Sequence, residues 1–469
     1  MIQLRAYQND AIEAVREAFR AGKRAPLLVA ATGAGKTVMF GFIASRTAAG
    51  GKRVLILCHR RELIRQASNK LREVGVAHGI IAPGFTGNRE LVQVASVQTL
   101  GRRLADPRHD APDLIVIDEA HHAAAGQWRT ILDAYPGARV LGVTATPQRL
   151  DGKGLGLEAG GVFDDLVLGP AAGELIEGGY LSPVRVFAPA EAPDLSGIRT
   201  VGGDYQASAL ADAMQRPKLV GDAIAHYSRH APGEPAILFS PSVAHAEAMA
   251  AAFREAGWRA ATASGSTPAT DRDAAIQGLA TGAVQVLCSC DLISEGLDVP
   301  AVSAVILMRP TKSLGLYMQQ VGRGLRPAPG KTHLTVLDHA GNTLTHGPID
   351  IAREWSLAGR VKKKRDQGDD AAPARQCPAC FAVHAPAASC PECGHLYESK
   401  AREIEAVAGE LVDMTDALAS RWGKQRPLRD VLREARDDDL AAVARARGYK
   451  PGWVHHMRQQ RAQRRAGAA

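Results

Sequence analysis

The chain has 469 residues, which is long enough for about three domains. Hydrophobic residues make up 46% of it and no apolar run reaches membrane-spanning length, so the composition favours a soluble globular protein over a membrane-embedded one. The formal net charge is +8, and from Ile351 to Ala469 there are 22 Lys and Arg residues against 16 Asp and Glu residues. Such a basic region is typical of a protein with a polyanionic partner, nucleic acid before membrane, but also of an ordinary solvated surface.

Apolar, strand-like runs alternate with helix-like stretches from the N-terminus to about residue 185. This alternation predicts an α/β lobe, residues 1–185, built on a doubly wound parallel sheet. A helix is expected over Arg61–Glu73, and a Pro- and Gly-rich connector with little periodicity is expected over residues 186–215. The expected strands of the lobe are residues 26–30, 54–58, 92–97, 114–118 and 139–145.

A glycine-rich turn, ATGAGKT at residues 31–37, follows the first strand and leads into a helix expected to begin at Lys36. In such a turn the backbone N–H groups point at an anion, and the helix N-terminus adds the positive end of its dipole. Lys36 supplies a charge for the β- and γ-phosphates, and the hydroxyl of Thr37 supplies a ligand for Mg²⁺. The turn therefore predicts binding of a nucleoside triphosphate, although Ala30 occupies the place of the first glycine of the general pattern.

Two carboxylates end the fourth expected strand. The run Leu114–Asp118 is apolar until Asp118, and Glu119 follows directly. Open α/β sheets bind their ligands at this carboxyl edge. Asp118 is suited to hold Mg²⁺, and Glu119 is suited to orient and deprotonate the water that attacks the phosphate. The alternative, an acidic pair that only caps a helix, is disfavoured by the phosphate-binding turn in the same sheet.

A second α/β lobe is expected over residues 216–355, without a phosphate-binding turn of its own. Its last expected helix carries Arg323 and Arg326 three residues apart, and therefore on one face. Alone, such a pair reads as a surface feature. Opposite a phosphate-binding turn it is typical of arginine fingers, which neutralise charge on the transferred phosphoryl group. The elements expected in this lobe are strands at 236–240, 284–289, 302–307 and 332–337, and helices near 242–256 and 314–325.

Further polar segments are difficult to explain by packing. Gln8, in the segment Arg5–Gln8, can hydrogen-bond the adenine edge, as Gln does in other settings. Polar or cationic groups also accompany expected strands at Cys58–Leu63, Gly142–Pro147 and Ser294–Pro300. The polar and cationic groups of Cys58–Leu63 leave their strand where a groove would lie.

Together these motifs resemble those of a superfamily 2 helicase. In chain order they are ATGAGKT, CHRREL, SVQTL, DEAH, TAT, ILFS, SEGLDVP and QQVGRGLR, and they cover residues 1 to about 345. The segment RAYQ, the His122 that follows DEAH, and Gly448–Trp453 resemble the XPB/RadD-like branch of bacterial and phage DNA helicases. The resemblance implies two RecA-like lobes that close on ATP and hydrolyse it to ADP and phosphate on single-stranded or branched DNA, in repair or recombination.

The resemblance also assigns roles to individual residues. The catalytic residues would be Lys36, Asp118, Glu119, Arg323 and Arg326. The nucleotide and its Mg²⁺ would be held by residues of both lobes: Arg5, Gln8, Thr32, Gly33, Ala34, Gly35, Lys36, Thr37, Asp118, Gly296 and Asp298. Hydrolysis would be coupled to lobe motion by His121, Thr144, Thr146 and Gln319. Nucleic acid would be bound, with little sequence preference, by His59, Arg60, Ser96, Gln98 and Thr99.

Two C-x₂-C pairs, nine residues apart, account for four of the seven cysteines: Cys377, Cys380, Cys390 and Cys393. A reducing cytoplasm disfavours disulfides, and four thiolates at this spacing suit tetrahedral Zn²⁺. We therefore expect a structural Cys₄ zinc ribbon over residues 376–397, in preference to redox pairs. Two histidines, His384 and His395, are alternative ligands that the site does not need. The other cysteines, Cys58, Cys288 and Cys290, are expected in the core.

A charged linker, residues 356–375, is expected before the ribbon, and a helical basic region, residues 398–469, after it. Amphipathic helices are expected over 402–420 and 427–447. A basic helix over 453–465 either engages a DNA backbone or lies as an ordinary surface helix.

Two other functions fit parts of the sequence: an RNA-directed helicase, and a zinc-ribbon nucleic-acid-binding adaptor with a regulatory ATPase. A restriction-type motor would need a partner for cleavage, because no nuclease carboxylate cluster is evident. DNA is the expected partner and RNA the alternative, with a repair or single-strand-binding protein as a further partner and no membrane. Residues Met1–Asp10 lack the basic and then apolar pattern of a secretion signal, so a cytoplasmic, nucleoid-associated location in a bacterium or an infected one is expected.

Overall fold

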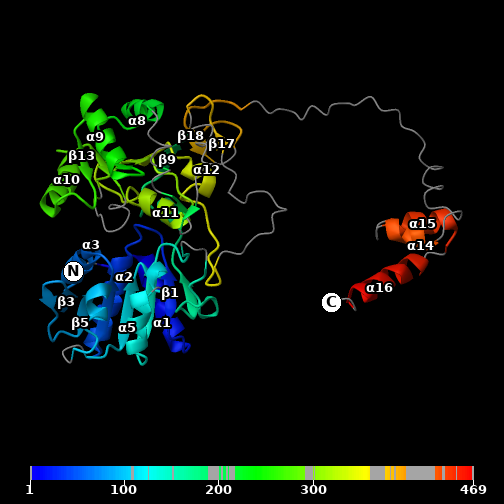
Figure 1. Ribbon diagram of the computed structural model, residues 1–469, viewed down its shortest axis with the longest axis horizontal. Coiled ribbons are helices and arrows are strands. Elements are labelled where there is room, and N and C mark those ends of the chain that lie inside the picture. Colours follow the sequence, from blue (N-terminus) through cyan, green and yellow to red (C-terminus); the bar gives the residue numbers. More distant parts are fainter. Residues whose placement is uncertain are drawn as a thin grey trace. The chain divides into compact units, whose positions relative to one another are not determined.

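The structure is a computed structural model in which the chain divides into two compact units, Met1–Tyr397 and Glu398–Ala469. Figure 1 shows two lobes in the first unit, the first in blue and cyan and the second mainly in green and yellow. Among the described residues no helix is both long and apolar enough to cross a membrane. The described residues are 3–106, 110–124, 126–149, 153–188, 200–201, 204–206, 210, 217–290, 299, 301–359, 375–380, 382–384, 387–397, 428–435, 439–449 and 452–466.

Lobe one is built on an eight-stranded sheet of order β4-β3-β5-β2-β6-β7-β1-β8. All neighbours are parallel except β3 and β4. The strands are β1 (Pro26–Val29), β2 (Val54–Cys58), β3 (His78–Ala82), β4 (Phe85–Thr86), β5 (Val92–Ser96), β6 (Leu114–Asp118), β7 (Arg139–Thr144) and β8 (Asp165–Leu168). The helices are α1 (Ala6–Arg20), α2 (Lys36–Ala49), α3 (Arg61–Glu73), α4 (Val97–Gly101), the 3₁₀ turn η1 (Ala120–His122), α5 (Gly126–Ala134), the 3₁₀ turn η2 (Leu157–Ala159) and α6 (Ala172–Glu177).

Both faces of this sheet are buried, which explains why its central strands are continuous apolar runs. Leu28 and Ile56 belong to a core shared with α1, α2 and α3, whereas their neighbours Leu27 and Leu57 belong to a core shared with α4 and α5. The five predicted strands are confirmed with ends within one residue, and so is the helix Arg61–Glu73. The strands β3, β4 and β8 at the sheet edges were not expected.

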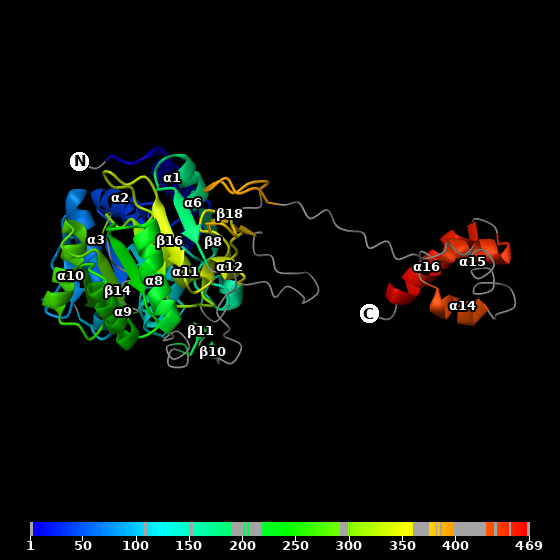
Figure 2. The same ribbon diagram turned by 90° about the horizontal axis from the view of Figure 1, so that it is seen from above.

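Lobe two is built on a second eight-stranded sheet, of order β13-β14-β12-β15-β16-β9-β18-β17. It is parallel from β13 to β9 and antiparallel from there on. Helices α8 and α9 share a buried core with one face of the sheet (Figure 2). The strands are β9 (Val184–Phe187), β12 (Ala236–Phe239), β13 (Ala260–Ala263), β14 (Val286–Ser289), β15 (Ala304–Leu307), β16 (Leu334–Asp338), β17 (Arg375–Gln376) and β18 (Ala382–His384). The helices are α8 (Pro217–His230), α9 (Val243–Glu255), α10 (Ala269–Thr281), α11 (Leu314–Gly322) and α12 (Asn342–His346).

The edge of this sheet differs from expectation. The predicted lobe boundary at residue 185 falls inside β9, which pairs with β16 of lobe two. On the other side of β9 lies β18 of the predicted ribbon, which therefore extends the lobe-two sheet instead of standing apart. Within the predicted connector, β10 (Thr200–Val201) and β11 (Asp204–Tyr205) form a hairpin. Asp204 ties this hairpin to lobe two by accepting hydrogen bonds of 2.8 Å from the Thr311 hydroxyl and the Lys312 N–H.

In the described residues of the second unit there are three helices, α14 (Leu428–Glu434), α15 (Leu440–Arg447) and α16 (Gly452–Ala466). Val431, Ala435 and Val443 form a small buried core against which Trp453 packs. The stretch 427–447 thus holds two helices. The helix predicted over 402–420 and linker residues 360–374 lie outside the described part of the chain.

Candidate functional site

The glycine-rich turn joins β1 to α2, which begins at Lys36 as predicted. Gly33 (φ 88°) and Gly35 (φ 81°) both adopt the left-handed conformation that only glycine takes without strain. There is also no room for a side chain at either position. A Cβ atom on Gly33 would lie 2.8 Å from Cδ2 of Leu181, and one on Gly35 would lie 2.5 Å from Nε2 of Gln8. The backbone geometry therefore requires both glycines.

Lys36 lies at the centre of the charges in the site. Its Nζ donates hydrogen bonds to the carbonyl oxygens of Ala30 (3.1 Å) and Ala31 (3.3 Å). Burial lowers the pKa of Lys36, the carboxylates of Glu119 and Asp118 oppose this shift, and two arginines of lobe two, Arg323 and Arg326, add to it. The structure thus brings together, around one ammonium group, carboxylates and arginines separated by about two hundred residues.

The carboxylates stand where β6 ends. Burial, and then the charge of Glu119, raises the pKa of Asp118 to about 7, while Lys36 opposes the shift. Among the described residues, Glu119 is the only non-glycine residue with a positive φ (φ 50°, ψ 53°). Such a conformation costs roughly 1–3 kcal/mol and is typical of functional sites. The backbone N–H of Glu119 donates to Oδ1 of Asp118 at 3.1 Å, which fixes the two residues relative to each other.

His121 connects the carboxylates to the end of β7. Its Nδ1 lies 3.4 Å from Oε2 of Glu119 and 3.4 Å from Oγ1 of Thr144. The Thr144 hydroxyl donates to the Thr146 carbonyl (3.0 Å) and accepts from the Thr146 N–H (3.2 Å). Three of the four residues expected to couple hydrolysis to motion therefore form one connected chain.

Helix α11 of lobe two lies against both motifs of lobe one. A Cβ atom on Gly322 would lie 2.4 Å from Cγ2 of Thr32, and one on Gly315 would lie 3.0 Å from Oγ1 of Thr146. Between these two contact points the helix buries Gln319. The lobes are therefore in contact at the phosphate-binding turn itself.

The two arginines do not share a helical face, which corrects the prediction. Helix α11 ends at Gly322, so Arg323 is its C-cap and Arg326 lies beyond it. The physical reason is local, because Gly324 favours a helix end and Pro327 disfavours a helical conformation at Arg326. Beyond the helix, other groups bond the free carbonyls. Ser182 donates from its N–H to the Leu325 carbonyl (2.7 Å) and from its hydroxyl to the Arg326 carbonyl (3.3 Å). The Lys331 ammonium donates to the carbonyls of Val302 (2.5 Å), Arg326 (2.9 Å) and Gly324.

The expected adenine-reading residues lie next to the turn. Gln8 is buried, its Nε2 donates to the Ala34 carbonyl (3.1 Å), and its Oε1 accepts from the Arg5 N–H (3.0 Å). The Arg5 guanidinium lies 5.1 Å from the centre of the Tyr180 ring. The expected contacts Gly296 and Asp298 of lobe two lie outside the described residues.

The five expected nucleic-acid residues lie together at the carboxyl ends of β2 and β5, which are paired in register. The Ser96 hydroxyl donates to Oε1 of Gln98 (2.9 Å), and Nε2 of Gln98 donates to the His59 carbonyl (3.2 Å). Ser96 also caps α4 by accepting from the Thr99 N–H (3.4 Å), and both residues are buried. Arg60 is the N-cap of α3. Gln98 is exposed, so it is the member best placed to meet a bound strand.

Sequence reasoning gave no role to Ser182, Lys331 or His122. The first two are invisible in the sequence because they act on backbone carbonyls of another segment. The ring of His122 lies between those of His59 (4.6 Å between centroids) and His121 (4.1 Å). The one signal for His122 in the sequence is that a second histidine directly follows His121, the last residue of DEAH.

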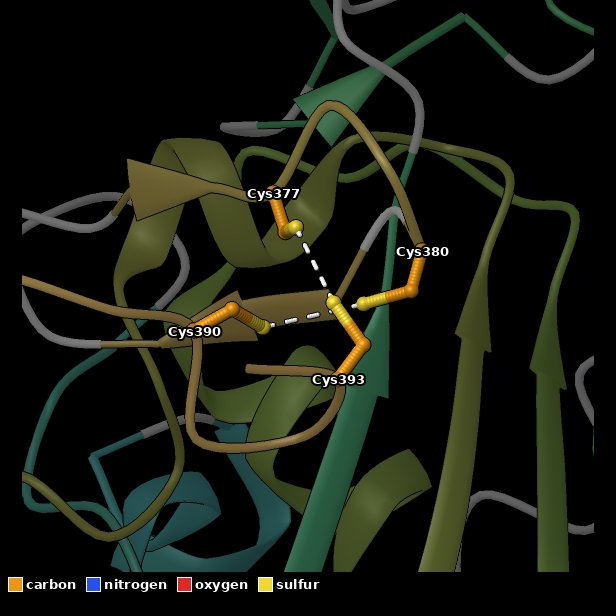
Figure 3. A group of neighbouring side chains, drawn as sticks. All are labelled: Cys377, Cys380, Cys390 and Cys393. Carbon is orange, nitrogen blue, oxygen red and sulfur yellow. Dashed lines mark hydrogen bonds between the residues drawn. The ribbon is translucent and has the colours of Figure 1, made fainter. Parts of the chain in front are cut away.

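The four ribbon cysteines converge (Figure 3). Their sulfur atoms all lie within 4.8 Å of one another, with Cys377 and Cys393 3.6 Å apart and Cys380 and Cys390 3.7 Å apart. Although burial opposes ionisation, backbone N–H groups lower the pKa of the Cys377 thiol to about 6. A set of four converging thiols, each offering one sulfur ligand, fits tetrahedral Zn²⁺.

The ribbon is attached to lobe two through β9. Arg185 of β9 pairs with Glu392 of the second knuckle, and the Gln376 side chain donates to the Ala188 carbonyl. His384 contacts the Tyr397 hydroxyl at 2.6 Å. The other cysteines, Cys58, Cys288 and Cys290, are buried, which confirms their place in the core.

Comparison with known families matches residues 1–149 to "Type III restriction enzyme, res subunit" and residues 216–328 to "Helicase conserved C-terminal domain". The chain is 32% identical over 402 residues to the 51.5 kDa protein of Lactococcus phage (isolate 7-9), covering 83% of this chain and 84% of that protein. It is 32% identical over 366 residues to the putative ATP-dependent helicase IRC3 of Saccharomyces cerevisiae, covering 72% of this chain but only 51% of that one.

Two solved structures share the fold. One is a fragment of a putative HsdR subunit of a type I restriction enzyme from Vibrio vulnificus YJ016, with a TM-score of 0.57, 23% identity, and coverage of 74% of this chain and 66% of that one. The other is the ATP-dependent type ISP restriction-modification enzyme LlaBIII bound to DNA, with a TM-score of 0.54, 18% identity, and coverage of 72% and 27%. Both match the two lobes in architecture.

Proposed function

Since the chain belongs to the superfamily 2 DEAD/DEAH-type helicases, which hydrolyse ATP, we propose that it is a DNA helicase or translocase. ATP is hydrolysed to ADP and phosphate between the lobes, on single-stranded or branched DNA that bridges them. The observation that carries the proposal is that the arginine segment of lobe two lies against the phosphate-binding turn of lobe one. A Cβ atom on Gly33 would lie 3.8 Å from Cγ of Arg326, and the charges of Arg323 and Arg326 help to lower the pKa of Lys36. A site completed by both lobes responds to whatever holds the lobes together.

Each group has a chemical task in this reaction. The backbone of the turn and Lys36 bind the phosphates, and Gln8 reads the adenine. Thr37 and Asp118 are the residues suited to hold Mg²⁺, which would neutralise phosphate charge when bound. Glu119 orients the attacking water and accepts its proton, and the two arginines stabilise the charge that develops on the transferred phosphoryl group.

DNA is proposed as the substrate, in repair or recombination as in the RadD-like branch. The likeness to a phage protein and to a restriction enzyme bound to DNA supports this choice, and the phage relative supports a bacterial or phage setting. A place near the nucleoid is part of the proposal, since DNA is the proposed substrate. A single-strand-binding or repair protein is the proposed protein partner. The exposed Gln98 and the neighbouring Arg60 are proposed strand contacts, together with His59, Ser96 and Thr99.

The test is ATP turnover by the full chain, titrated with single-stranded DNA, forked DNA, duplex DNA and RNA at two salt concentrations. We expect stimulation by single-stranded or forked DNA that weakens at the higher salt, because phosphate contacts release counterions. Stimulation by RNA alone would replace the proposal with the RNA-directed alternative. Absence of turnover with every nucleic acid would leave the adaptor role.

We also propose that Cys377, Cys380, Cys390 and Cys393 bind one structural Zn²⁺, since all four coordination positions would be filled by protein. Metal analysis of the purified chain is expected to give about one zinc per chain. Cys393→Ser, at the exposed ligand, should lower this content, whereas Cys290→Ala, at a buried cysteine outside the set, should not. A zinc content unaffected by Cys393→Ser would contradict the assignment.

A further inference from the structure

Three histidine rings form a row between the proposed strand contacts and the carboxylate of Glu119. His122 occupies the middle, 4.6 Å from the ring of His59 and 4.1 Å from that of His121. Trp128 of α5 lies 6.3 Å from His59 and backs that end of the row. None of the roles assigned above, for phosphate, metal or transferred phosphoryl, uses His122.

One end of the row reaches the surface. The His59 carbonyl accepts a hydrogen bond from Gln98, whose side chain is exposed and also accepts from the Ser96 hydroxyl. A nucleic-acid strand that binds at the carboxyl ends of β2 and β5 would meet Gln98 and His59 together. The first residue of the row is therefore hydrogen-bonded, through its carbonyl, to a proposed strand contact.

The other end of the row reaches the chemistry. His121 lies 3.4 Å from the Glu119 carboxylate and 3.4 Å from the Thr144 hydroxyl. Thr144 is bonded to Thr146, which lies against α11 of lobe two at Gly315. The last ring therefore contacts the proposed general base and, through two threonines, the opposite lobe.

The segment that carries His121 and His122 is a single short turn. It is closed by hydrogen bonds from the His122 N–H to the Glu119 carbonyl (3.1 Å) and from the Ala123 N–H to the Ala120 carbonyl (3.0 Å). Glu119 begins this turn in a left-handed conformation that only its surroundings can maintain. Because Glu119, His121 and His122 share this hydrogen-bonded turn, a displacement of His122 would also reach His121 and the Glu119 carboxylate.

We propose that His122 is a positioning residue that links strand contact at His59 to the orientation of Glu119. This inference rests on the proposed function, because it takes Glu119 as the base and the region of His59 as the strand contact. His122 acts through its two neighbouring rings. Packed rings transmit a displacement because a close-packed interior offers them few other arrangements.

The test compares His122→Ala, which removes the ring, with His122→Phe, which keeps a ring in the row. ATP turnover of the full chain is measured against the concentrations of ATP and of an oligodeoxythymidylate, and DNA binding is measured by fluorescence anisotropy. For His122→Ala we expect the DNA-stimulated kcat to fall about tenfold, while KM for ATP and Kd for DNA change less than about twofold. His122→Phe should recover most of the stimulated kcat.

His78→Ala is the matched control. His78 is a half-buried histidine of the same lobe that contacts the Ser68 hydroxyl at 2.7 Å and lies outside the row. Its loss is expected to lower the melting temperature without lowering the stimulated kcat. This separates a general loss of stability from a loss of positioning.

The outcomes distinguish the inference from the function on which it rests. Stimulation that persists unchanged in His122→Ala would overturn the link alone. Equal losses in His122→Ala and His122→Phe would also overturn it, because the ring would then not be what transmits the contact. A wild-type chain whose turnover responds to no nucleic acid would overturn the proposed function, and the link with it.

Discussion

The two lobes hold their halves of the ATP site by different means. In lobe one, both groups follow a buried strand, the phosphate-binding turn after β1 and Glu119 directly after β6, and the sheet fixes their separation. In lobe two, Arg326 stands on a loop beyond α11, and its carbonyl is held by the side chains of Ser182 and Lys331. The sheet therefore positions the lobe-one half of the ATP site, whereas a few hydrogen bonds position the lobe-two half.

This difference places the adjustable part of the site in lobe two. Disrupting a buried strand costs several kcal/mol, whereas a typical hydrogen bond to a loop contributes about 1 kcal/mol. The loop that follows α11 and carries Arg326, here called the arginine loop, is bonded by Ser182. Ser182 lies just before β9, and the ribbon is attached to β9. Substitutions in lobe one are therefore expected to abolish turnover, and those around the lobe-two loop to reduce it by degrees.

The largest effects should come from the lobe-one groups. Lys36→Ala removes the charge for the phosphates and Glu119→Gln removes the proposed base, so each should lower kcat by about a thousandfold or more. Arg323→Ala should also lower kcat but spare ATP binding, measured with a fluorescent ATP analogue, because its charge acts on the transition state. Full turnover by Glu119→Gln would remove the assignment of the base.

Turnover should depend on the length and charge of Lys331, because its ammonium group bonds the carbonyls of the arginine loop. Lys331→Met keeps the length but removes the donors to three carbonyls, so kcat should fall about tenfold to a hundredfold as Arg326 loses its position. Lys331→Arg keeps the charge and should recover part of the loss. The measurement is kcat with ATP binding in parallel, and equal losses in both variants would show that Lys331 supports the fold and not the loop.

The contrast between the lobes also explains what the sequence could predict. Five of the eight strands of lobe one were predicted to within a residue, because a strand buried on both faces, such as Leu114–Asp118, is an uninterrupted apolar run. The phosphate-binding turn and the start of α2 are encoded by seven consecutive residues. Both depend on local sequence.

The unpredicted features depend on contacts between distant segments. The helix predicted over 314–325 ends at Gly322, and the sequence does not show which groups bond the carbonyls beyond it. Those of Leu325 and Arg326 accept from Ser182, more than one hundred residues upstream. The strand β9 has the same difficulty, since its partners β16 and β18 lie far along the chain. The place of His122 between two rings leaves no trace in spacing or composition.

The next largest effect should come from a change of pH, which alters the charge of the lobe-one carboxylate Asp118. Burial raises the pKa of Asp118 to about 7, so a proton competes with Mg²⁺ below that pH, and the Mg²⁺ concentration for half-maximal turnover should rise about tenfold from pH 8 to pH 6. Because the folded pKa lies above the unfolded one, ionised Asp118 should destabilise the metal-free fold as pH rises from about 4 to about 7. Thermal unfolding without Mg²⁺ checks the sign, and Asp118→Asn should flatten that part of the profile.

The smallest effects should come from ion pairs that join the lobes away from the ATP site. Glu62 of α3 pairs with Arg272 of α10 at 3.1 Å, and both side chains are less than one-third exposed. Reversing one charge, in Glu62→Arg or Arg272→Glu, should weaken the contact between the lobes and lower turnover about two- to fivefold at low salt. The double reversal restores an opposite pair and should recover most of the loss, and high salt should reduce the difference.

The neighbouring pair provides the control for this last effect. Arg65 and Asp273 join the same two helices at 3.3 Å, but both side chains are about half exposed, so water and salt screen their attraction more strongly. Reversal of Arg65 should therefore change turnover less than reversal of Glu62. An equal effect from both pairs would mean that the net charge of the chain, and not contact between the lobes, controls the rate. In that case the position of Arg326 would depend on the arginine loop and not on the ion pairs between the lobes.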